Sequence, residues 1–194
     1  MKQFVFGLGN PGEKYAATRH NVGFQVVERL TKVVCGQRFS QVSHLQPQLH
    51  AQLYRGGELF FSQPVTYMND SGLAVMKVIQ YFDKDLLVSL KKGEPAGTSE
   101  APAVIVIYDD LDIPLGQWKI QFGKGPKVHN GLNSIRDHLK NDAFLHVRVG
   151  IDGRQGQRLQ SGSEYVLTAF HGQELQQVEI AFNQVCEELK KRLQ

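Results

Sequence analysis

Apolar residues follow two kinds of pattern that alternate along the chain. Continuous or alternating apolar runs predict β-strands at residues 4–6, 53–54, 59–61, 103–107, 118–122 and 145–151. Apolar residues spaced three and four apart predict amphipathic helices that begin near residues 22, 71, 133 and 175. Because strands alternate with helices, the sequence predicts an α/β fold. We expect a single domain over residues 1–194, with a mixed, mostly parallel central sheet flanked by helices on both faces.

Three local signals refine this prediction. The turn at residues 55–57 joins two predicted strands as a hairpin, which makes the sheet mixed. Asn21 and Ser71 stand just before apolar periodic segments, where each is expected to cap a helix. Residues 91–102 hold two Pro and two Gly without apolar periodicity, so we expect a surface loop inserted into the domain.

Composition narrows the class of protein. The 194 residues are 41% hydrophobic and 21% charged, which is typical of one folded domain. No apolar run approaches the roughly 18 residues that span a bilayer, and the N-terminus lacks the apolar length of a signal peptide. Cys35 and Cys186 are too few for a disulfide framework or a four-ligand zinc site. We therefore expect a cytoplasmic protein with no membrane partner.

Basic residues gather in one part of the chain. The formal net charge is +3, yet residues 119–158 alone carry eight Lys or Arg against three Asp or Glu. Such a local excess suits a polyanionic partner, although a solvated surface explains it equally well. Charge alone leaves both interpretations open.

The glycine-rich segment 7–12 follows the first predicted strand and fits the pattern G-x-G-x-x-G of dinucleotide-binding folds. In those folds a helix begins at the glycines and directs its N–H groups at a pyrophosphate. Here Pro11 interrupts the motif, and the helical pattern begins about ten residues later. A tight turn is therefore favoured, but a turn does not explain why Asn10 stands within it.

His20 lies immediately ahead of the predicted helix at residue 22. The positive end of a helix dipole disfavours protonation of a nearby imidazole, which keeps a general base available near neutral pH. A single histidine is also common on the surface or in a core. Catalysis and a structural role both remain open at this point.

Three carboxylates, Asp109, Asp110 and Asp112, follow the most apolar predicted strand. This is the edge of the sheet where α/β proteins place their sites. The carboxylates suit Mg²⁺ binding through oxygen, and one of them equally suits orienting a histidine. Because adjacent strand residues point to opposite faces, the three need not converge, and a solvated acidic turn is the third interpretation.

Two further polar segments, 67–72 and 129–132, each precede a predicted helix. Asn69 and Asn130 offer an amide donor and acceptor that suit a peptide-like group, although each also suits a helix cap. The sequence contains no nucleophilic serine elbow and no HExxH or CxxC spacing. If the chain is a hydrolase, water activated by a base is the expected nucleophile.

Taken together, these segments resemble a known family. The motifs of bacterial-type peptidyl-tRNA hydrolases appear in the same order as GLGNPG, TRHNVGF, TYMNDSG, YDDLDIPLG, HNGLNSI and RVGI. The resemblance runs from about Phe4 to about Phe170. It implies a monomeric α/β enzyme that cleaves the ester between a stalled peptide and the 3′ ribose of tRNA. The implied partner is peptidyl-tRNA, bound at its acceptor stem and 3′ end, and no metal or other cofactor is implied.

The resemblance also implies a role for individual residues. His20 is implied as the general base and Asp109 as the carboxylate that orients it. Three amides are implied to hold the peptide backbone and the water: Asn10, Asn69 and Asn130. The pocket near the terminal adenosine and the adjoining peptide is implied to be shaped by Tyr15 and Met68. Contacts to tRNA phosphates are implied for Arg148, with nearby basic residues Lys119, Lys124 and Lys127.

The chain departs from the family pattern beside these motifs. Lys127 and Val128 stand where the family usually has two glycines before HNG. The family typically has two basic residues on the strand that follows the YDDLDIPLG motif. Lys119 is retained at the first position, but Gln121 stands at the second. In family members the second basic residue and the Arg of RVGI together bind the tRNA 5′ phosphate. We expect Lys124 or Lys127 to compensate.

Two alternatives belong to other classes of protein. A catalytically silent relative that only binds RNA would keep the fold, as the plant organelle splicing factors that resemble this family do. Retention of the amides with His20 and Asp109 favours the enzyme, because a pure binder has no need of them. A metal-dependent nuclease built on the acidic cluster is the more distant alternative.

Overall fold

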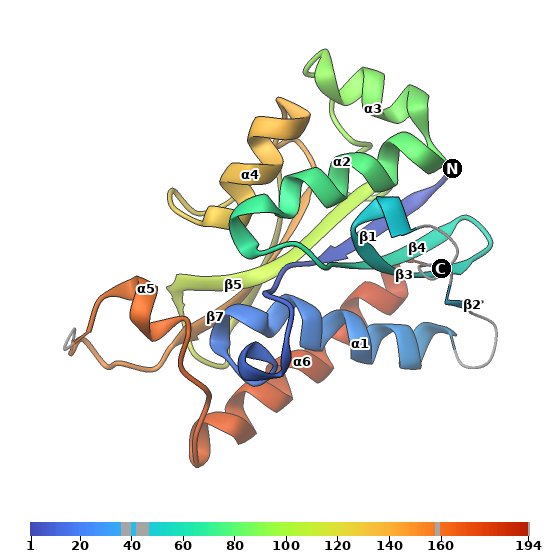
Figure 1. Ribbon diagram of the computed structural model, residues 1–194. Coiled ribbons are helices and arrows are strands. Elements are labelled where there is room, and N and C mark those ends of the chain that lie inside the picture. Colours follow the sequence, from blue (N-terminus) through green and yellow to red (C-terminus); the bar gives the residue numbers. More distant parts are fainter. Residues whose placement is uncertain (36–39, 42–46, 158–159, 194) are drawn as a thin grey trace.

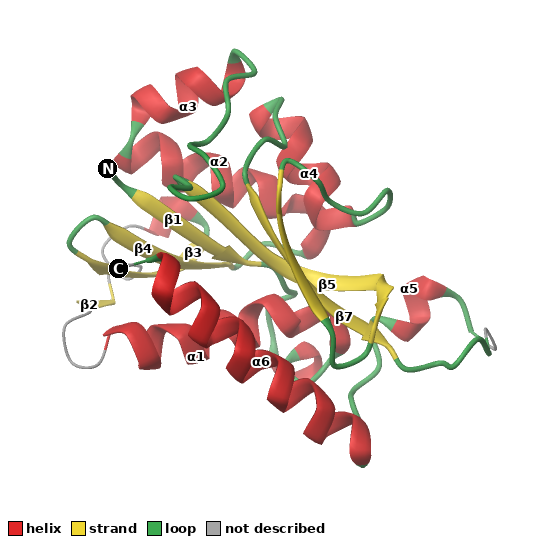
Figure 2. Cartoon of the chain, turned by 180° about the vertical axis from the view of Figure 1, so that it is seen from behind, coloured by secondary structure: helices red, strands yellow, loops and turns green. Residues whose placement is uncertain are grey.

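A central sheet lies between two layers of helices in the computed structural model, which describes residues 1–35, 40–41, 47–157 and 160–193 (Figure 1). Three helices cover one face: α2 (Ser71–Phe82), α3 (Lys84–Lys91) and α4 (Asn130–Leu139). Two helices cover the other face, as the view from behind shows (Figure 2): α1 (Val22–Cys35) and α6 (Gln173–Arg192). The short helix α5 (Gly162–Tyr165) lies beyond one end of the sheet.

The sheet has seven described strands in the order β2-β3-β4-β1-β5-β7-β6. Their bounds are β1 Gln3–Gly7, β2 Ser40–Gln41, β3 Ala51–Gly56, β4 Leu59–Pro64, β5 Val104–Pro114, β6 Trp118–Phe122 and β7 Leu145–Asp152. The central strands β4, β1, β5 and β7 run parallel, and antiparallel pairs extend the sheet at both edges. The predicted α/β fold with a mixed sheet is therefore confirmed, with the parallel pairing confined to the centre.

Strand alternation divides the core between the two faces of the sheet. Phe4 and Phe6 pack towards α2 and α4, whereas Val5 packs towards α1 and α6. Residues 104–108 of β5 alternate in the same way and are fully buried. Strands buried on both faces are continuously apolar, which explains why β1 and β5 were the clearest strands in the sequence.

Several predicted details are corrected. Asn21 does not cap α1, because its side chain binds the backbone of Asn10. Ser71 does not cap α2 either, since its hydroxyl donates to the carbonyl oxygen of Met68. Three elements of the structure have no counterpart among the predicted strands and helices: α3, α5 and β2. Residues 91–102 do form a largely exposed loop, anchored by the fully buried Ala96. No helix in the described ranges is long and apolar enough to cross a membrane.

The helices α2 and α4 approach each other closely at Gly72. A Cβ atom added there would overlap the carbonyl oxygen of Ser134 in α4. Because Gly72 has no side chain, the two helices come close enough for the Gly72 N–H to donate to the Ser134 hydroxyl at 3.0 Å. The contact fixes the positions of the two segments that precede these helices, and both segments contribute to the site described below.

We expect Gly72→Ala to separate the two helices and to lower the free energy of unfolding by about 1–3 kcal/mol, the cost of overpacking a tight interface. Urea denaturation measures this change. Ser134→Ala removes only the hydroxyl and should cost about 1 kcal/mol. Equal stability of Gly72→Ala and the parent protein would show that the interface is loose.

Candidate active site

The polar segments singled out from the sequence meet at one end of the sheet. Parallel strands have their carboxyl ends at the same edge, so the chain segments that leave them come together. The segment after β1 carries Asn10, the segment after β4 carries Met68 and Asn69, and β5 carries Asp109. Together with the segments before α4 and around α5 they line a cavity of about 700 Å³, hereafter the cleft.

A buried carboxylate lies at the base of the cleft and binds His20. The Nδ1 atom of His20 lies 2.8 Å from Oδ1 of Asp109, and the two residues are 8% and 2% exposed. Because a carboxylate accepts, Nδ1 donates, and Nε2 of the neutral imidazole keeps its lone pair. His20 lines the cleft, so this lone pair is available to a molecule bound there.

A second histidine that sequence reasoning did not assign binds the same carboxylate oxygen. Nε2 of His129 lies 3.1 Å from Oδ1 of Asp109. Nδ1 of His129 accepts the N–H of Leu132 at 3.3 Å, which leaves the ring proton on Nε2 to donate. Its position one residue before Asn130 was the available signal, but the sequence does not show that it faces Asp109.

The two histidines hold the Asp109 carboxylate in its charged form. Burial alone would raise the pKa of Asp109, but the hydrogen bonds from His20 and His129, and the positive charge of each imidazole when it is protonated, outweigh it. The pKa of Asp109 therefore lies well below its usual value of 3.8. An ionised, fixed acceptor keeps the His20 proton on Nδ1.

A buried pair supports His129 from behind. The Tyr108 hydroxyl donates to Nδ1 of His146 at 3.0 Å, and Nε2 of His146 donates to the carbonyl oxygen of Asp142. Burial raises the pKa of Tyr108 and lowers that of His146, so both groups are kept neutral. The Tyr108 ring contacts the His129 ring at 5.1 Å between centroids, which limits movement of the imidazole.

Asn10 is held in one orientation by three hydrogen bonds. The side chain of Asn21 accepts the Asn10 N–H and donates to the Asn10 carbonyl, each at 2.9 Å. Oδ1 of Asn10 accepts the N–H of Met68 at 2.9 Å. Because the oxygen is used in this way, the Nδ2 amino group is the part of the side chain that remains to donate into the cleft.

The other predicted cleft residues also line the cavity. Asn69 and Asn130 are exposed, and neither amide is hydrogen-bonded to another residue in the described part of the chain. His129, not Asn130, caps α4, so the cap interpretation of Asn130 is wrong. Tyr15 is half-buried and Met68 is 4% exposed, and both contribute to the wall.

The three carboxylates of the acidic cluster do not converge. Asp109 binds the histidines, whereas Oδ2 of Asp110 accepts from Nε of Arg148 at 2.7 Å, and Asp112 is exposed. The one group of described residues with metal-ligand spacing is His20, Asp109 and His129, whose ligand atoms lie within 4.8 Å of one another. In this structure both imidazole N–H groups donate to a single oxygen, so the histidines serve as hydrogen-bond donors.

The predicted phosphate-binding residues differ in burial and in whether their charge is already paired. Arg148 is 9% exposed and also donates to Gln121 at 2.8 Å, so its charge is largely engaged. Lys119, Lys124 and Lys127 are exposed, and none forms an ion pair with another residue of the described ranges. Lys127 lines the cleft itself. Arg158, which adds to the basic stretch in the sequence, lies outside the described residues.

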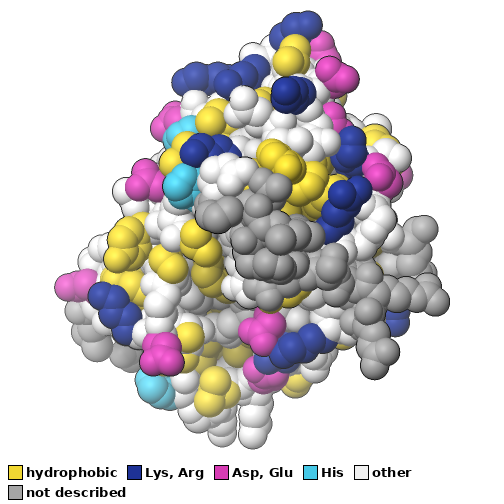
Figure 3. All heavy atoms as spheres, turned by 45° about the vertical axis from the view of Figure 1, so that its right-hand side comes forward, with side chains coloured by type: hydrophobic (Ala, Val, Ile, Leu, Met, Phe, Trp, Pro, Cys, Tyr) yellow, Lys and Arg dark blue, Asp and Glu magenta, His cyan; other side chains and the backbone are white. Residues whose placement is uncertain are grey.

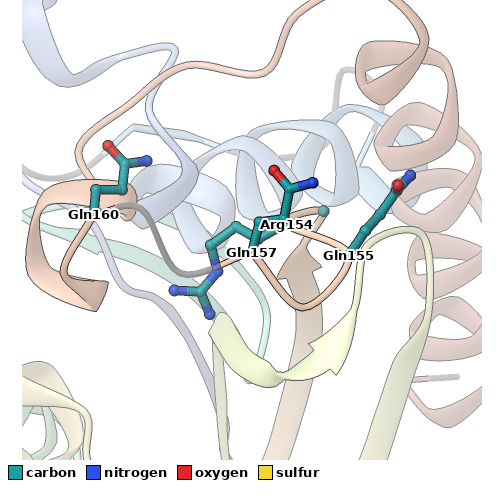
Figure 4. Close-up of a pocket in the computed structure, with 5 residues that line it drawn as sticks. Arg154, Gln155, Gln157 and Gln160 are labelled. Atoms are coloured by element: carbon teal, nitrogen blue, oxygen red, sulfur yellow. The ribbon is translucent and has the colours of Figure 1, made fainter.

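A second hollow lies next to the cleft, along the segment that joins β7 to α5. Four polar side chains are spread along it without converging on one point: Arg154, Gln155, Gln157 and Gln160 (Figure 4). Arg154 is bound to Asp152, since its Nε donates to Oδ1 at 2.8 Å. Among the described residues that line this hollow, none is a base or a nucleophile, whereas the cleft contains His20.

The cleft combines a base with amide donors. His20 can accept a proton from water, Asp109 can stabilise the imidazolium that forms, and Asn10 can donate to a developing negative charge. The arrangement suits hydrolysis of an activated acyl compound by water.

Comparison with known proteins connects this cleft to one family. The family model described as peptidyl-tRNA hydrolase matches residues 4–194. A peptidyl-tRNA hydrolase of Aliarcobacter butzleri is 37% identical over 175 residues, which cover 90% of this chain and 83% of the relative. Another, of Lactiplantibacillus plantarum, is 38% identical over 170 residues, which cover 88% of this chain and 80% of the relative.

Solved structures agree with the sequence comparisons. A crystal structure of peptidyl-tRNA hydrolase in complex with N-propanol has a TM-score of 0.78 at 28% identity, covering 98% of this chain and 88% of that one. The structure of peptidyl-tRNA hydrolase from Acinetobacter baumannii has a TM-score of 0.76 at 28% identity, covering 97% and 87%. Both proteins therefore share the fold described above.

We expect His129→Phe to raise the pKa of Asp109, because one of its two hydrogen-bond donors is lost. A carboxyl whose pKa is lowered by folding stabilises the native state above its usual pKa and loses that contribution as the pH falls. The variant should therefore lose less stability between pH 4 and pH 2 than the parent. The difference in the free energy of unfolding should approach about 1.4 kcal/mol for each unit by which the pKa of Asp109 rises.

Carbon NMR titration of the Asp109 carboxyl, with urea denaturation at each pH, measures both effects. His138→Phe, in which an imidazole bound to the Ser134 carbonyl is replaced, is the matched control and should leave Asp109 unchanged. An unaltered Asp109 titration in His129→Phe would contradict the geometry.

Proposed function

This chain belongs to the peptidyl-tRNA hydrolase family, and we propose from this membership and from the cleft that it hydrolyses the ester between a peptide and the 3′ ribose of tRNA. The reaction releases tRNA from peptides that left translation early. The observation that carries the proposal is the His20–Asp109 hydrogen bond of 2.8 Å at the base of a cleft that also contains Asn10.

Water is the nucleophile in the proposed reaction. Nε2 of His20 takes a proton from a water molecule as its oxygen attacks the ester carbonyl carbon. Asp109 keeps the imidazole in the Nδ1–H form and stabilises its charge after the transfer. The proton then passes to the departing ribose oxygen as the tetrahedral intermediate collapses, which gives a free peptide carboxylate and a free tRNA.

The amides bind the substrate around this step. The Nδ2 amino group of Asn10 donates to the carbonyl oxygen as negative charge develops on it. Asn69 and Asn130 bind backbone amide groups of the peptide, because each offers both a donor and an acceptor. Tyr15 and Met68 supply apolar wall near the terminal adenosine and the adjoining peptide.

The chemistry distinguishes esters from amides. A ribose hydroxyl is a better leaving group than an amine, so one base and a few amide donors suffice. Asp109 is charged and bound by two imidazoles, so it supplies no further proton to a departing amine. Peptide bonds in the same substrate therefore survive. The reaction requires no metal or other cofactor.

Exposed lysines beside the cleft bind the acceptor stem and 3′ end of the tRNA. Lys119, Lys124 and Lys127 have no acidic partner in the described ranges, so their charges are available to phosphates. Such contacts do not read sequence, which suits an enzyme that accepts many tRNAs. On the face shown in Figure 3 the coloured Lys and Arg side chains are interspersed with Asp and Glu.

Arg148 takes part in phosphate binding through its neighbours. Its guanidinium is bound to Asp110 and Gln121, and its closest partner across the β6–β7 ladder is Lys119. It offsets the charge of Asp110, which would otherwise repel a phosphate near Lys119. Gln121 adds no charge of its own, so the compensating charge comes from Lys124 and Lys127.

The silent RNA-binding alternative is not favoured, because binding RNA does not require a fixed His20–Asp109 pair. We further propose that the enzyme acts in the cytoplasm, where peptidyl-tRNA arises. We also propose that it acts as a monomer, as the resemblance to the family implies.

We expect the protein to release tRNA from N-acetyl-aminoacyl-tRNA in EDTA, and His20→Ala to reduce kcat by a factor of at least 10³ while folding normally. A gel or acid-precipitation assay of tRNA release measures the rate. His171→Ala replaces an exposed histidine that does not line the cleft, so this control should retain the parent rate. Release that persists in His20→Ala would place the base elsewhere, and release that is lost in EDTA would indicate a metal.

The lysine contacts predict a change in salt dependence. We expect the double variant Lys124→Ala/Lys127→Ala to bind tRNA more weakly and to reduce the slope of log K against log salt by about 1–2. Filter binding between 50 and 200 mM salt measures it. Lys84→Ala/Lys91→Ala on α3 is the charge-matched control. An unchanged slope in the first variant would remove these lysines from the phosphate contacts.

A further inference from the structure

Three large apolar side chains stand exposed around the mouth of the cleft. Tyr67 is 57% exposed, Val128 is 81% exposed and Leu167 is 47% exposed, and all three line the cavity. Single exposed apolar residues are common on folded proteins. Three that come from separate segments and border one cavity form an apolar rim, which is characteristic of a binding site.

Two of these residues stand in the same local arrangement. Tyr67 precedes the exposed amide of Asn69 by two positions, just before α2. Val128 precedes the exposed amide of Asn130 by two positions, at the start of α4. The residue between is buried in both segments (Met68 and His129). Each segment therefore presents one apolar group and one amide to the cleft.

The close packing of α2 on α4 holds these two segments in fixed positions. Gly72 and Ser134 lie at the contact, and their hydrogen bond of 3.0 Å joins the first turn of α2 to the middle of α4. The backbone segments that carry the two apolar groups and the two amides are thus held in place, so binding need not order these segments.

An extended peptide has the matching chemistry. Its backbone amides recur along the chain, and its side chains project to alternate sides at about 3.3 Å per residue. If the two amides bind the peptide backbone, the neighbouring apolar groups contact the peptide side chains. In peptide recognition, backbone hydrogen bonds usually supply affinity and side-chain contacts supply specificity. Nucleotides offer no equivalent series of apolar side chains.

We infer that Tyr67 and Val128 are specificity-determining residues that contact the side chains of the last two residues of the peptide. The enzyme therefore prefers peptidyl-tRNAs whose peptides end in large apolar residues. This inference rests on the proposed hydrolase function and adds the class of peptide. Val128 is the more informative of the two, because its side chain is 81% exposed and can be removed with little effect on packing.

The test uses one tRNA body charged with either N-acetyl-Leu-Leu or N-acetyl-Asn-Asn, which have similar shape and differ in polarity. We expect kcat/KM to be about five- to tenfold higher for the Leu-Leu substrate, mainly through a lower KM, since a side-chain contact of this size gives that discrimination. In Val128→Gly the ratio should fall about threefold or more, because the variant should lose more kcat/KM on the Leu-Leu substrate than on the Asn-Asn substrate.

Two further variants separate apolar contact from loop geometry. Val128→Thr keeps the β-branched shape but adds a hydroxyl, so its ratio should lie between those of the parent and Val128→Gly. Val88→Thr, at a 52% exposed position on α3 that does not line the cleft, should leave the ratio unchanged.

Equal kcat/KM for the two substrates, or a ratio that Val128→Gly leaves unchanged, would overturn the inference while the hydrolase function stands. An equal loss on both substrates in Val128→Gly gives the same unchanged ratio and also overturns it. Release of tRNA from neither substrate by the parent protein would instead overturn the proposed function.

Discussion

The cleft depends on one buried oxygen atom. Oδ1 of Asp109 accepts hydrogen bonds from both His20 and His129, at 2.8 and 3.1 Å. Burying the Asp109 carboxylate without partners would destabilise the fold, because this residue is only 2% exposed. The hydrogen bonds from the two imidazoles offset that desolvation. In return the carboxylate fixes which nitrogen of His20 carries the proton. The direction of the lone pair on Nε2 follows from that single constraint.

The fold supplies the remaining constraints through its parallel strands. The ends of β1 and β4 bring Asn10 and Met68 to β5, where Asp109 lies. The Asn21 side chain then holds the Asn10 backbone on both its N–H and its carbonyl. A residue that the sequence suggests as a helix cap therefore serves to orient a residue of the cleft. These hydrogen bonds hold the turn after β1 in one conformation, so the Asn10 side chain has a fixed position from which to donate.

Much of the fold could be predicted from the sequence, because β1 and β5 are continuously apolar and the main helices are amphipathic. The gathering of Asn10, His20, Asp109 and Asn130 in one cleft was also predicted, through motif resemblance. The role of His129 was not, since its contact with Asp109 spans 20 positions and depends on how α4 docks on the sheet. The pairing of Arg148 with Asp110 and Gln121 was missed for the same reason, as it joins three strands. Sequence patterns report periodicity, whereas these contacts depend on tertiary packing.

In the proposed mechanism Asp109 acts by keeping the proton of His20 on Nδ1. Nitrogen NMR of the His20 ring in Asp109→Asn, recorded beside kcat and KM for N-acetyl-aminoacyl-tRNA, tests it directly. We expect the Nδ1–H form to be depleted and kcat to fall by about 10²–10⁴, while KM changes little. A parent-like kcat in a variant whose His20 has lost the Nδ1–H form would contradict it.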